Sequence, residues 1–257
     1  MPKQHATLSA SKAHRWMECP RSVALEQLFP DETTEYAEEG TAAHALAELE
    51  LRLAILGDDH VEHWEFTDLE LEMQTKGFDS KEIHYYIEQY LDYCKELYDQ
   101  SKLQHLLTFA DIEARLDFSK YVPQGFGTGD FLLIAGTTLH IIDLKYGKGV
   151  PVKAPGNPQI RLYGLGAIEL YGLIFDIETV KMHIFQPRIN NISIETMSRK
   201  DLEDWGNTSV MKRAQMAYDN CGTFEPGDHC QFCKARATCK ARAQRMIQII
   251  QNILGGQ

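Results

Sequence analysis

The sequence lacks any apolar run approaching the roughly 18 residues that a membrane-spanning helix needs. Its first residues, Met-Pro-Lys-Gln-His, do not form the apolar core of a signal peptide. Internal repeats and low-complexity linkers are also missing. We therefore expect a cytoplasmic protein without a membrane association. Its 257 residues suffice for one large domain, which would bury roughly 70–75% of the surface of the unfolded chain.

Cysteine is scarce and unevenly placed. Of six cysteines, three cluster near the C-terminus, at Cys230, Cys233 and Cys239. In a reducing compartment cysteines stay free or bind metal rather than form disulfides, and this spacing is typical of a metal site whose fourth ligand lies elsewhere. Cys19 and Cys221 compete for that place, and Cys94 needs no such role. Spacing alone leaves zinc and an iron–sulfur cluster as alternatives.

The net charge of −11 is unusual for a protein that binds nucleic acid, but the charges are unevenly distributed. Between Asp31 and Glu72, Arg52 is the only Lys or Arg. Two later groups are basic: Lys145, Lys148, Lys153 and Arg161, and then Lys234, Arg236, Lys240, Arg242 and Arg245. A local basic surface supplies phosphate contacts despite an acidic total. Ordinary solvated faces are the alternative, above all for the second group.

Hydrophobic periodicity predicts a helical N-terminal third, a mixed centre and a helical end. Ser9 is expected to cap a short helix that Pro20 interrupts. Further helices are predicted over 35–56, 80–98, 158–171 and 200–218, and strands over 107–116, 129–134, 139–145 and 180–186. The expected fold class is α/β, with a mixed central sheet flanked by helices. We expect a single domain composed of a helical part (1–100), a core (101–220) and a cysteine segment (221–257).

The most informative segment is a predicted hairpin that ends at Lys145. A two-residue turn that begins at Gly136 places Asp130 directly opposite Asp143. Opposed side chains have Cβ atoms roughly 4.5–5.5 Å apart, so the two carboxylates repel unless a cation lies between them. Strand alternation also puts Lys145 on the face of Asp143. The hairpin predicts a metal site, and two solvent-facing acids on edge strands are the alternative.

Phosphodiester hydrolysis is a reaction that needs such a site, because it requires an activated water and compensation of charge on the phosphate. Carboxylates hold Mg²⁺ or Mn²⁺, and a nearby Lys orients water or stabilises charge. Three motifs occur in order: Gly127-Thr-Gly-Asp130, Asp143-Leu-Lys145 and Gln159-Ile-Arg-Leu-Tyr163. Together they resemble the RecB-like branch of the PD-(D/E)XK nuclease superfamily. The resemblance implies a restriction-endonuclease-like fold and a metal-dependent deoxyribonuclease. Asp130 and Asp143 would bind the metal, and Lys145 would assist the attacking water.

The resemblance extends to Gly40-Thr-Ala-Ala-His44, which is similar to the context of a metal-binding histidine in that family. It implies His44 as a further ligand, with the carbonyl of Leu144 available to the same ion. Gln159 and Tyr163 are four residues apart and share a helix face, and by resemblance they contact DNA or brace the site. On periodicity alone, His44 is an ordinary packed or surface histidine. Glu113 is expected to face solvent, with a contact to a second metal or to water as the alternative.

The segments that contain the cysteines also resemble a known group of proteins. Trp16-Met-Glu-Cys19-Pro-Arg, followed much later by the three-cysteine group, resembles iron–sulfur nucleases such as the AddB type and the CRISPR adaptation nucleases. This implies that a 4Fe–4S cluster clamps both chain ends in a helical cap, with Cys94 and Cys221 outside it. The ligands would be Cys19, Cys230, Cys233 and Cys239.

Segments 5–16 and 35–44 are similar to phage and prophage RecB-like proteins. This similarity implies an exonuclease that processes DNA ends in recombination or replication within a bacterial host cell. Its partners would be DNA and a recombination, annealing or helicase protein. The rival interpretation is a non-catalytic nucleic-acid-binding or assembly module that keeps the fold and the cluster. Oligomeric state, polarity and strand preference stay open.

Overall fold

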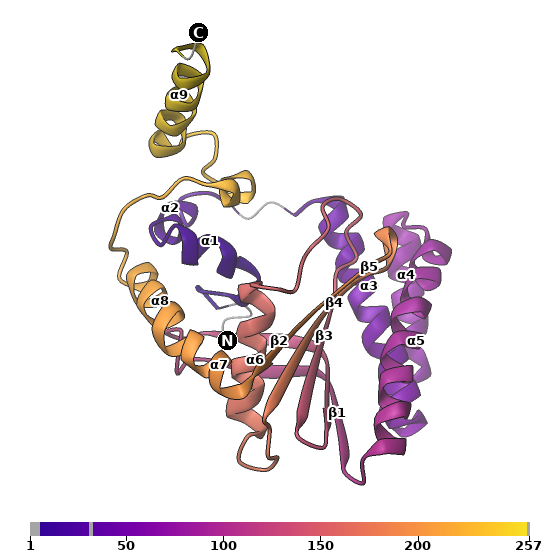
Figure 1. The fold of residues 1–257 in the computed structure, drawn as a ribbon. Helices are drawn as coiled ribbons and strands as arrows, with labels where there is room; N and C mark the ends of the chain where they lie inside the picture. The colour runs from indigo at the N-terminus through magenta and orange to yellow at the C-terminus, as the bar shows by residue number, and fades with distance from the viewer. Residues whose placement is uncertain (1–5, 31–32, 256–257) are drawn as a thin grey trace. The chain divides into compact units, whose positions relative to one another are not determined.

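The computed structural model describes residues 6–30 and 33–255 (Figure 1), so parts of the predicted segments 1–100 and 221–257 lie outside it. The chain divides into two compact units that interleave along the sequence. The first, the sheet unit, comprises Glu32–Leu116 and Thr128–Leu202. The second, the cysteine unit, comprises Met1–Asp31, Asp117–Gly127 and Glu203–Gln257. Within the described residues, no helix combines the length and the apolarity that crossing a membrane requires.

The sheet has five strands in the order β1-β2-β3-β4-β5 (Figure 1). They are β1 (Thr108–Asp117), β2 (Phe126–Ala135), β3 (Thr138–Leu144), β4 (Thr179–Gln186) and β5 (Asn191–Ser198). Strand β3 pairs antiparallel with β2 and parallel with β4, and β4 pairs antiparallel with β5. The predicted α/β class, a mixed sheet flanked by helices, is confirmed. Strand β5 is an addition to the four predicted strands.

The turn between β2 and β3 explains why the hairpin register could be predicted. Gly136 has a φ of 56°, as the first central position of a type II′ turn requires. A Cβ at Gly136 would also lie 2.8 Å from Nδ1 of His105. The predicted register is confirmed by the pairing of Phe131 with Ile142. Asp130 and Asp143 follow directly in this register.

The helices of the sheet unit begin with local capping. Thr34 Oγ1 accepts from Ala37 N (3.2 Å), Asp79 Oδ1 from Glu82 N (3.2 Å), and Asn157 Oδ1 from Gln159 N (2.9 Å). The helices are α3 (Glu35–Leu51) with a π-helical turn (Arg52–Leu56), α4 (His63–Lys76), α5 (Ser80–Gln104) and α6 (Pro158–Tyr171). Short 3-10 turns lie at Asp58–His60 and Pro187–Ile189. The predicted bounds of α6 are confirmed, α5 runs further than expected, and α4 is an addition.

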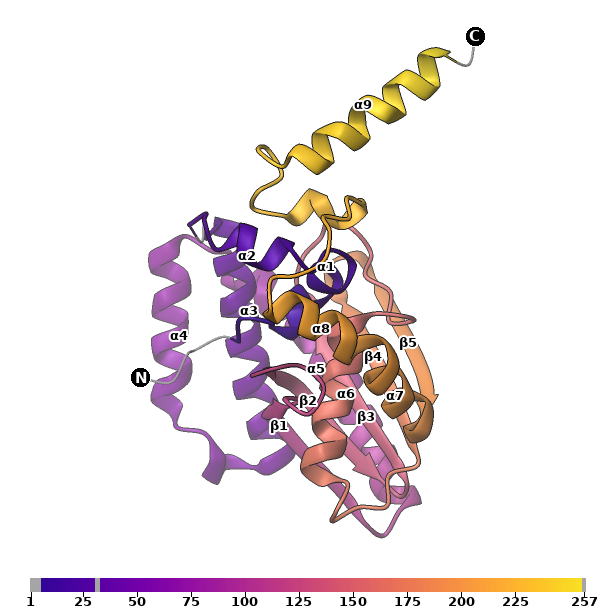
Figure 2. The same cartoon turned by 90° about the vertical axis from the view of Figure 1, so that its left-hand side faces the viewer.

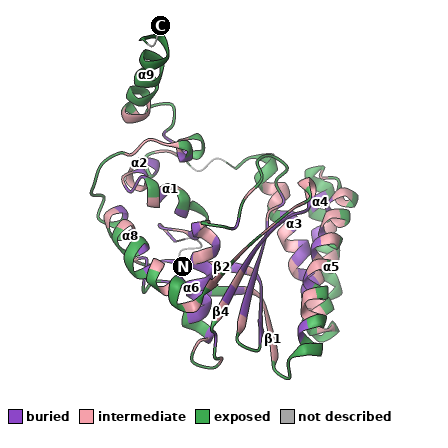
Figure 3. Ribbon diagram, viewed as in Figure 1, coloured by how far each residue is buried: buried purple, intermediate pink, exposed green. Residues whose placement is uncertain are grey.

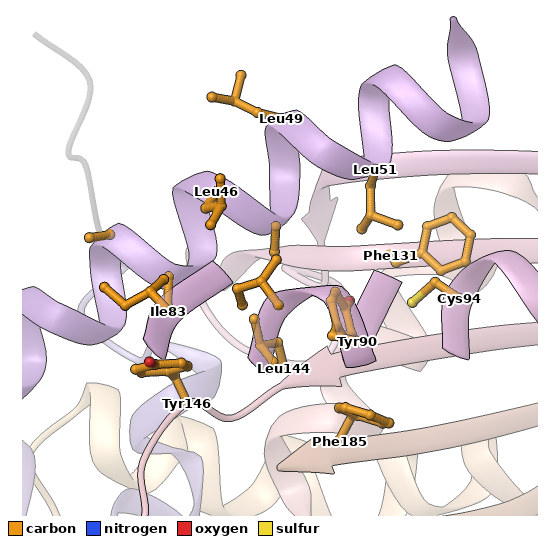
Figure 4. Close-up of a cluster of buried hydrophobic side chains, with 14 of the residues drawn as sticks. Leu46, Leu49, Leu51, Ile83, Tyr90, Cys94, Phe131, Leu144, Tyr146 and Phe185 are labelled. Atoms are coloured by element: carbon orange, nitrogen blue, oxygen red, sulfur yellow. The ribbon is translucent and has the colours of Figure 1, made fainter. Parts of the chain in front are cut away.

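One face of the sheet packs against helices α3 to α5 (Figures 3 and 4). Leu46, Ile87 and Tyr90 from these helices contribute to a cluster with Phe131 and Leu144 from the strands. Burial of each such side chain contributes roughly 1.5–3 kcal/mol. The other face packs closely on α6, because a Cβ at Gly164 would lie 2.8 Å from Leu202 and 3.5 Å from Ile141. This packing fixes the N-terminal turn of α6 beside the end of β3.

The cysteine unit contains short helices. They are a 3-10 turn (Ala10–Lys12), α1 (Ala13–Glu18), α2 (Ser22–Glu26), α8 (Met211–Tyr218), a 3-10 turn (Asp228–Phe232) and α9 (Lys240–Gly255). The predicted helix 200–218 is present as α7 (Arg199–Trp205), a π-helical turn (Gly206–Val210) and α8. Pro20 separates α1 from α2 as predicted. The prediction for Ser9 is wrong, since its side chain makes no capping hydrogen bond. Its carbonyl instead accepts from Nε1 of the buried Trp16 at 3.0 Å.

Candidate metal centre and cysteine pocket

Three side chains from three elements form a group of metal ligands in the sheet unit. His44 from α3, Glu113 from β1 and Asp130 from β2 each offer one atom, and these atoms all lie within 4.8 Å of one another. His44 Nδ1 is 3.4 Å from Asp130 Oδ1. One imidazole nitrogen with carboxylate oxygens is a donor set that suits Mn²⁺ and Mg²⁺. The residues present therefore fit a divalent cation.

Glu113 reaches this group through an irregular backbone. Its φ is 52°, a conformation that costs a residue with a side chain roughly 1–2 kcal/mol. In a strand such a residue is typical of a bulge, which redirects a side chain. The expectation that Glu113 faces solvent is wrong, because the side chain is half-buried in the ligand group. Burial, with a further contribution from Asp130, raises the pKa of Glu113 to about 8.

The acidic side chains of the site differ in how well neighbouring positive charges compensate them. Burial acts to raise the pKa of Asp130, but His44, Lys145 and the amide of Leu144 outweigh it and leave the pKa below its ordinary value. For Asp143, burial and the neighbouring Asp130 prevail over Lys145, so the pKa is raised. Burial acts to lower the pKa of His44, yet the charge of Asp130 raises it to about 8. The shifts of His44 and Asp130 are those of an ion pair, whereas the raised pKa values of Glu113 and Asp143 reflect burial and repulsion between carboxylates, which a bound cation would offset.

Gln159 connects the remaining side chains. Its Oε1 accepts from Lys145 Nζ at 3.0 Å, and its Nε2 donates to Asp143 Oδ1 at 3.3 Å and to Tyr163 OH at 3.2 Å. Lys145 Nζ also lies 2.8 Å from Asp143 Oδ2. That contact is an ion pair, and the buried Oδ2 has no other partner among the described residues. Asp143 thus keeps one oxygen with unused capacity for a ligand.

The structure brings the predicted site residues of the sheet unit together, with one difference of detail. Asp143 lies outside the group of His44, Glu113 and Asp130, and it contacts Lys145 and Gln159 instead. The amide of Leu144 donates to Asp130 Oδ2 at 2.7 Å, and the role expected for its carbonyl stays a prediction. This bond fixes one carboxylate oxygen of Asp130, while the other lies toward His44.

The four predicted cysteine ligands line one pocket of the cysteine unit. These are Cys19, Cys230, Cys233 and Cys239. The cavity between them is small, about 20 Å³, and it is partly open to solvent. Backbone amides already donate to two sulfurs, Glu225 N to Cys19 Sγ and Gly227 N to Cys230 Sγ, each at 3.4 Å. Amides directed at sulfur are a common feature of thiolate metal sites, and they stabilise negative charge there.

The other two cysteines lie elsewhere. Cys94 is buried in the core of the sheet unit, and burial raises its pKa. Cys221 is exposed and is absent from the lining of the pocket. Within the described residues, no three cysteine sulfurs lie within 4.8 Å of one another.

An ion pair between Arg15 and Glu26 supports the segment around Cys233. No pattern in the sequence predicts this pair. Arg15 Nε donates to Glu26 Oε2 at 2.9 Å, linking α1 to α2. Arg15 also donates to the carbonyl of Phe232 (3.0 Å), and Glu26 accepts from the amide of Lys234 (2.9 Å). The pair thus holds the residues on both sides of Cys233. Such a contact over more than 200 positions leaves no local pattern in the sequence.

Comparison with known proteins gives a family and a structural neighbour. A solved structure described as "Crystal structure of SSO0001" is similar over 94% of this chain and 89% of that chain, with 14% sequence identity and a TM-score of 0.37. A family model described as "Protein of unknown function (DUF2800)" matches residues 5–254. Because this match spans nearly the whole sequence, the chain belongs to the DUF2800 family.

Proposed function

We propose that this protein is a metal-dependent deoxyribonuclease. The observation that carries the proposal is the ligand group of His44, Glu113 and Asp130 beside the network of Asp143, Lys145 and Gln159. A module that only binds DNA has no need of buried acids gathered with a histidine, because each costs free energy to bury unless a cation compensates its charge.

Each side chain has a role in hydrolysis of a phosphodiester bond. His44, Glu113 and Asp130 would hold the divalent ion, with Asp143 Oδ2 available to it as well. When bound, the ion supplies Lewis-acid polarisation of the phosphate and lowers the pKa of a coordinated water. Lys145 presents a positive Nζ to the attacking water or to a phosphate oxygen. Gln159 fixes that amine by accepting its hydrogen bond, and Tyr163 braces Gln159.

The cysteine pocket completes the proposal. Cys19, Cys230, Cys233 and Cys239 would hold a 4Fe–4S cluster, supported by their shared pocket and by the two amides directed at sulfur. Burial raises the pKa of Cys19 and, to about 11, that of Cys233. Metal binding must therefore displace protons from these thiols, and its free energy stabilises the fold. The cluster's role would be architectural, since hydrolysis transfers no electron.

The biological setting follows from the resemblance described above. We place the enzyme in the cytoplasm of a bacterial host, where it would process DNA ends for phage recombination or replication as an exonuclease. The resemblance also suggests an annealing or helicase protein as a partner. These assignments depend on the nuclease activity and are tested after it.

The decisive experiment incubates anaerobically purified protein with end-labelled linear, circular and single-stranded DNA, with and without Mn²⁺ or Mg²⁺. The matched control is Asp143→Ala, purified identically to exclude contaminating nuclease. We expect metal-dependent release of nucleotides from linear DNA by the wild type only. Equal cleavage by both proteins would refute the assignment. DNA binding without cleavage under any metal condition would favour the rival binding module.

A further inference from the structure

The segment between the end of β3 and α6, residues 147–157, differs in charge from the rest of the chain. No Asp or Glu occurs between Asp143 and Glu169, although the protein carries 37 acidic residues. The segment contains Lys148 and Lys153, both exposed, and neither forms an ion pair within the described part of the chain. We call it the 147–157 loop. It leads directly from Lys145 to the helix that carries Gln159 (Figure 1).

The loop has no regular secondary structure, yet side chains of β4 and β5 bind its backbone at successive points. Gln186 Oε1 accepts from the amide of Val152 (2.6 Å), and Asn191 Nδ2 donates to the carbonyl of the same residue (2.9 Å). Ser193 Oγ accepts from Ala154 N at 2.9 Å, and Glu195 Oε1 accepts from Gly156 N at 3.1 Å. We call these four side chains the ladder.

The ladder follows the geometry of an edge strand. Asn191, Ser193 and Glu195 alternate along β5 and share one face of it, while Ile192 and Ile194 on the other face are exposed. β5 is the terminal strand of the sheet (Figure 2), and the loop lies against the face of β5 that carries these polar side chains. The alternating polar residues thus hold an otherwise irregular loop in one conformation.

Fixing a long exposed loop is entropically costly, so a fold needs a reason to do it. Gln186 Nε2 adds weaker contacts to the carbonyls of Gly147 (3.5 Å) and Val150 (3.4 Å), so the held region extends close to Lys145. Glu195, which is paired with Arg161 at 2.8 Å, ties the other end to α6. A surface ordered in advance binds with a smaller loss of entropy than one that orders on contact.

We propose that the 147–157 loop is a preformed contact surface for the phosphodiester backbone of the DNA strand that enters the metal centre. Lys148 and Lys153 would neutralise phosphates, and the ladder would keep them in place. The proposal rests on the proposed function for the identity of the ligand as DNA. It assigns the loop to binding rather than to the chemical step, which Lys145 and the ligand group perform.

The test measures binding of a fluorescent single-stranded oligonucleotide and of a duplex end over a series of salt concentrations, in Ca²⁺ to suppress cleavage. The variants are Lys148→Ala/Lys153→Ala and the ladder variant Asn191→Ala/Ser193→Ala. The control is Lys81→Ala/Lys95→Ala, which removes two exposed lysines from α5. Circular dichroism and thermal melting establish that each variant is folded. KM and kcat are then measured in Mn²⁺.

Loss of both loop lysines should weaken binding about 10-fold at moderate salt and reduce the slope of log K against log salt by about 1.4–1.8, as expected for two lost phosphate contacts. KM should rise while kcat at saturating DNA changes little. The ladder variant should lose affinity with an unchanged slope, because its lysines remain. The control should match the wild type in affinity, slope, KM and kcat.

The outcomes separate this proposal from the nuclease assignment. A wild type that cleaves DNA, with affinity and slope unchanged in the lysine variant, overturns the role of the loop and leaves the nuclease intact. Salt-dependent binding that requires the loop, without cleavage by the wild type, overturns the nuclease and leaves the loop as a DNA contact. A fall in kcat equal to the fall in kcat/KM would overturn the assignment to binding. A ladder variant with wild-type affinity would overturn the need for a preformed loop.

Discussion

The backbone amide of Leu144 donates a 2.7 Å hydrogen bond to Oδ2 of Asp130. The bond joins β3 to a carboxylate on β2, so it ties the two strands together next to Asp143. It also leaves Oδ1 of Asp130 as the atom that lies toward His44. The carboxylate is therefore oriented before any ion binds, and metal binding loses little entropy in ordering it.

The first prediction concerns the catalytic pair. We expect Asp143→Ala and Lys145→Ala to lower the cleavage rate by a factor on the order of 10³ or more, because each removes water activation or charge stabilisation rather than packing. Both proteins should stay folded and still bind DNA. Asp143 is buried with an imperfectly compensated charge, so its removal should not lower the melting temperature. Cleavage at the wild-type rate by either variant would falsify the catalytic assignment.

The second prediction concerns Glu113 as a metal ligand. Glu113→Gln keeps the size of the side chain and removes the carboxyl group that metal binding would deprotonate, so the Mn²⁺ concentration for half-maximal activity should rise at least about 10-fold. The measurement is a titration of cleavage rate against Mn²⁺, with Glu88→Gln on the exposed face of α5 as control. A crystal soaked in Mn²⁺ should show its anomalous peak beside His44, Glu113 and Asp130. A peak remote from Glu113 would remove this residue from the ligand set.

The third prediction concerns the backbone of the same residue. In most strands Gly is less stable than Ala, but at the φ of 52° found for Glu113 the order should reverse. We expect Glu113→Gly to be more stable than Glu113→Ala by about 1 kcal/mol, since only Gly adopts this φ without a steric cost. Denaturant unfolding of the two variants measures the difference. A more stable alanine variant would show that the strand is regular in solution.

Local rules made the hairpin and α6 predictable. A turn of two residues fixes strand pairing, so recognising Gly136 was enough to place Asp130 opposite Asp143. Asn157 and Pro158 likewise define the first residue of α6, because one caps the helix and the other suits its first turn. These rules involve neighbours in sequence, and they need no knowledge of the tertiary structure.

Most features that the sequence does not predict depend on contacts between residues far apart in the chain. The positive φ at Glu113 has no sequence signal, since no Gly or Asn occupies this position, and the neighbours of the carboxylate lie on α3 and β2, far away in the sequence. The Arg15–Glu26 pair acts on a loop near the opposite end of the chain. By contrast, β5 carries an alternation of Ile192 and Ile194 with polar residues that does predict a strand.

The fourth prediction concerns the cysteine pocket. Protein purified without oxygen should contain about four iron atoms and show a visible absorption band. Cys19→Ser should lose the iron and melt at a lower temperature, whereas Cys221→Ser should keep both properties, because Cys221 is exposed outside the pocket. The cleavage rate of Cys19→Ser should fall only in proportion to its loss of folded protein, because hydrolysis does not use the cluster. Stoichiometric zinc without iron would overturn the cluster identity, and metal loss only on changing Cys221 would overturn the ligand set.

The fifth prediction is a pH dependence of stability that arises from two buried histidines. His140 Nδ1 lies 3.2 Å from His183 Nε2, and His183 Nδ1 lies 2.7 Å from Tyr93 OH. The bond between the rings contains one proton, so protonating both rings would set two N–H groups against each other. Burial, together with nearby Lys181, lowers the pKa of His183 to about 4. Burial and then His183, Lys181 and His105 lower that of His140 to about 3.

In the unfolded chain the two histidines titrate at about pH 6.5. Between about pH 4 and 6.5 the unfolded chain therefore binds more protons than the folded chain. Stability contributed by the neutral pair is therefore fully present above about pH 7 and is lost as the pH falls through this window, by up to about 1.4 kcal/mol per pH unit for each histidine. His140→Gln/His183→Gln, which keeps hydrogen-bonding groups that do not titrate, should flatten this part of the profile. The exposed His63→Gln serves as the control and should leave it unchanged. The difference is measured by urea unfolding at pH values of roughly 4.5, 5.5 and 7.5, which span this window. Parallel profiles for the wild type and the double variant would show that the pair does not remain neutral in the folded protein.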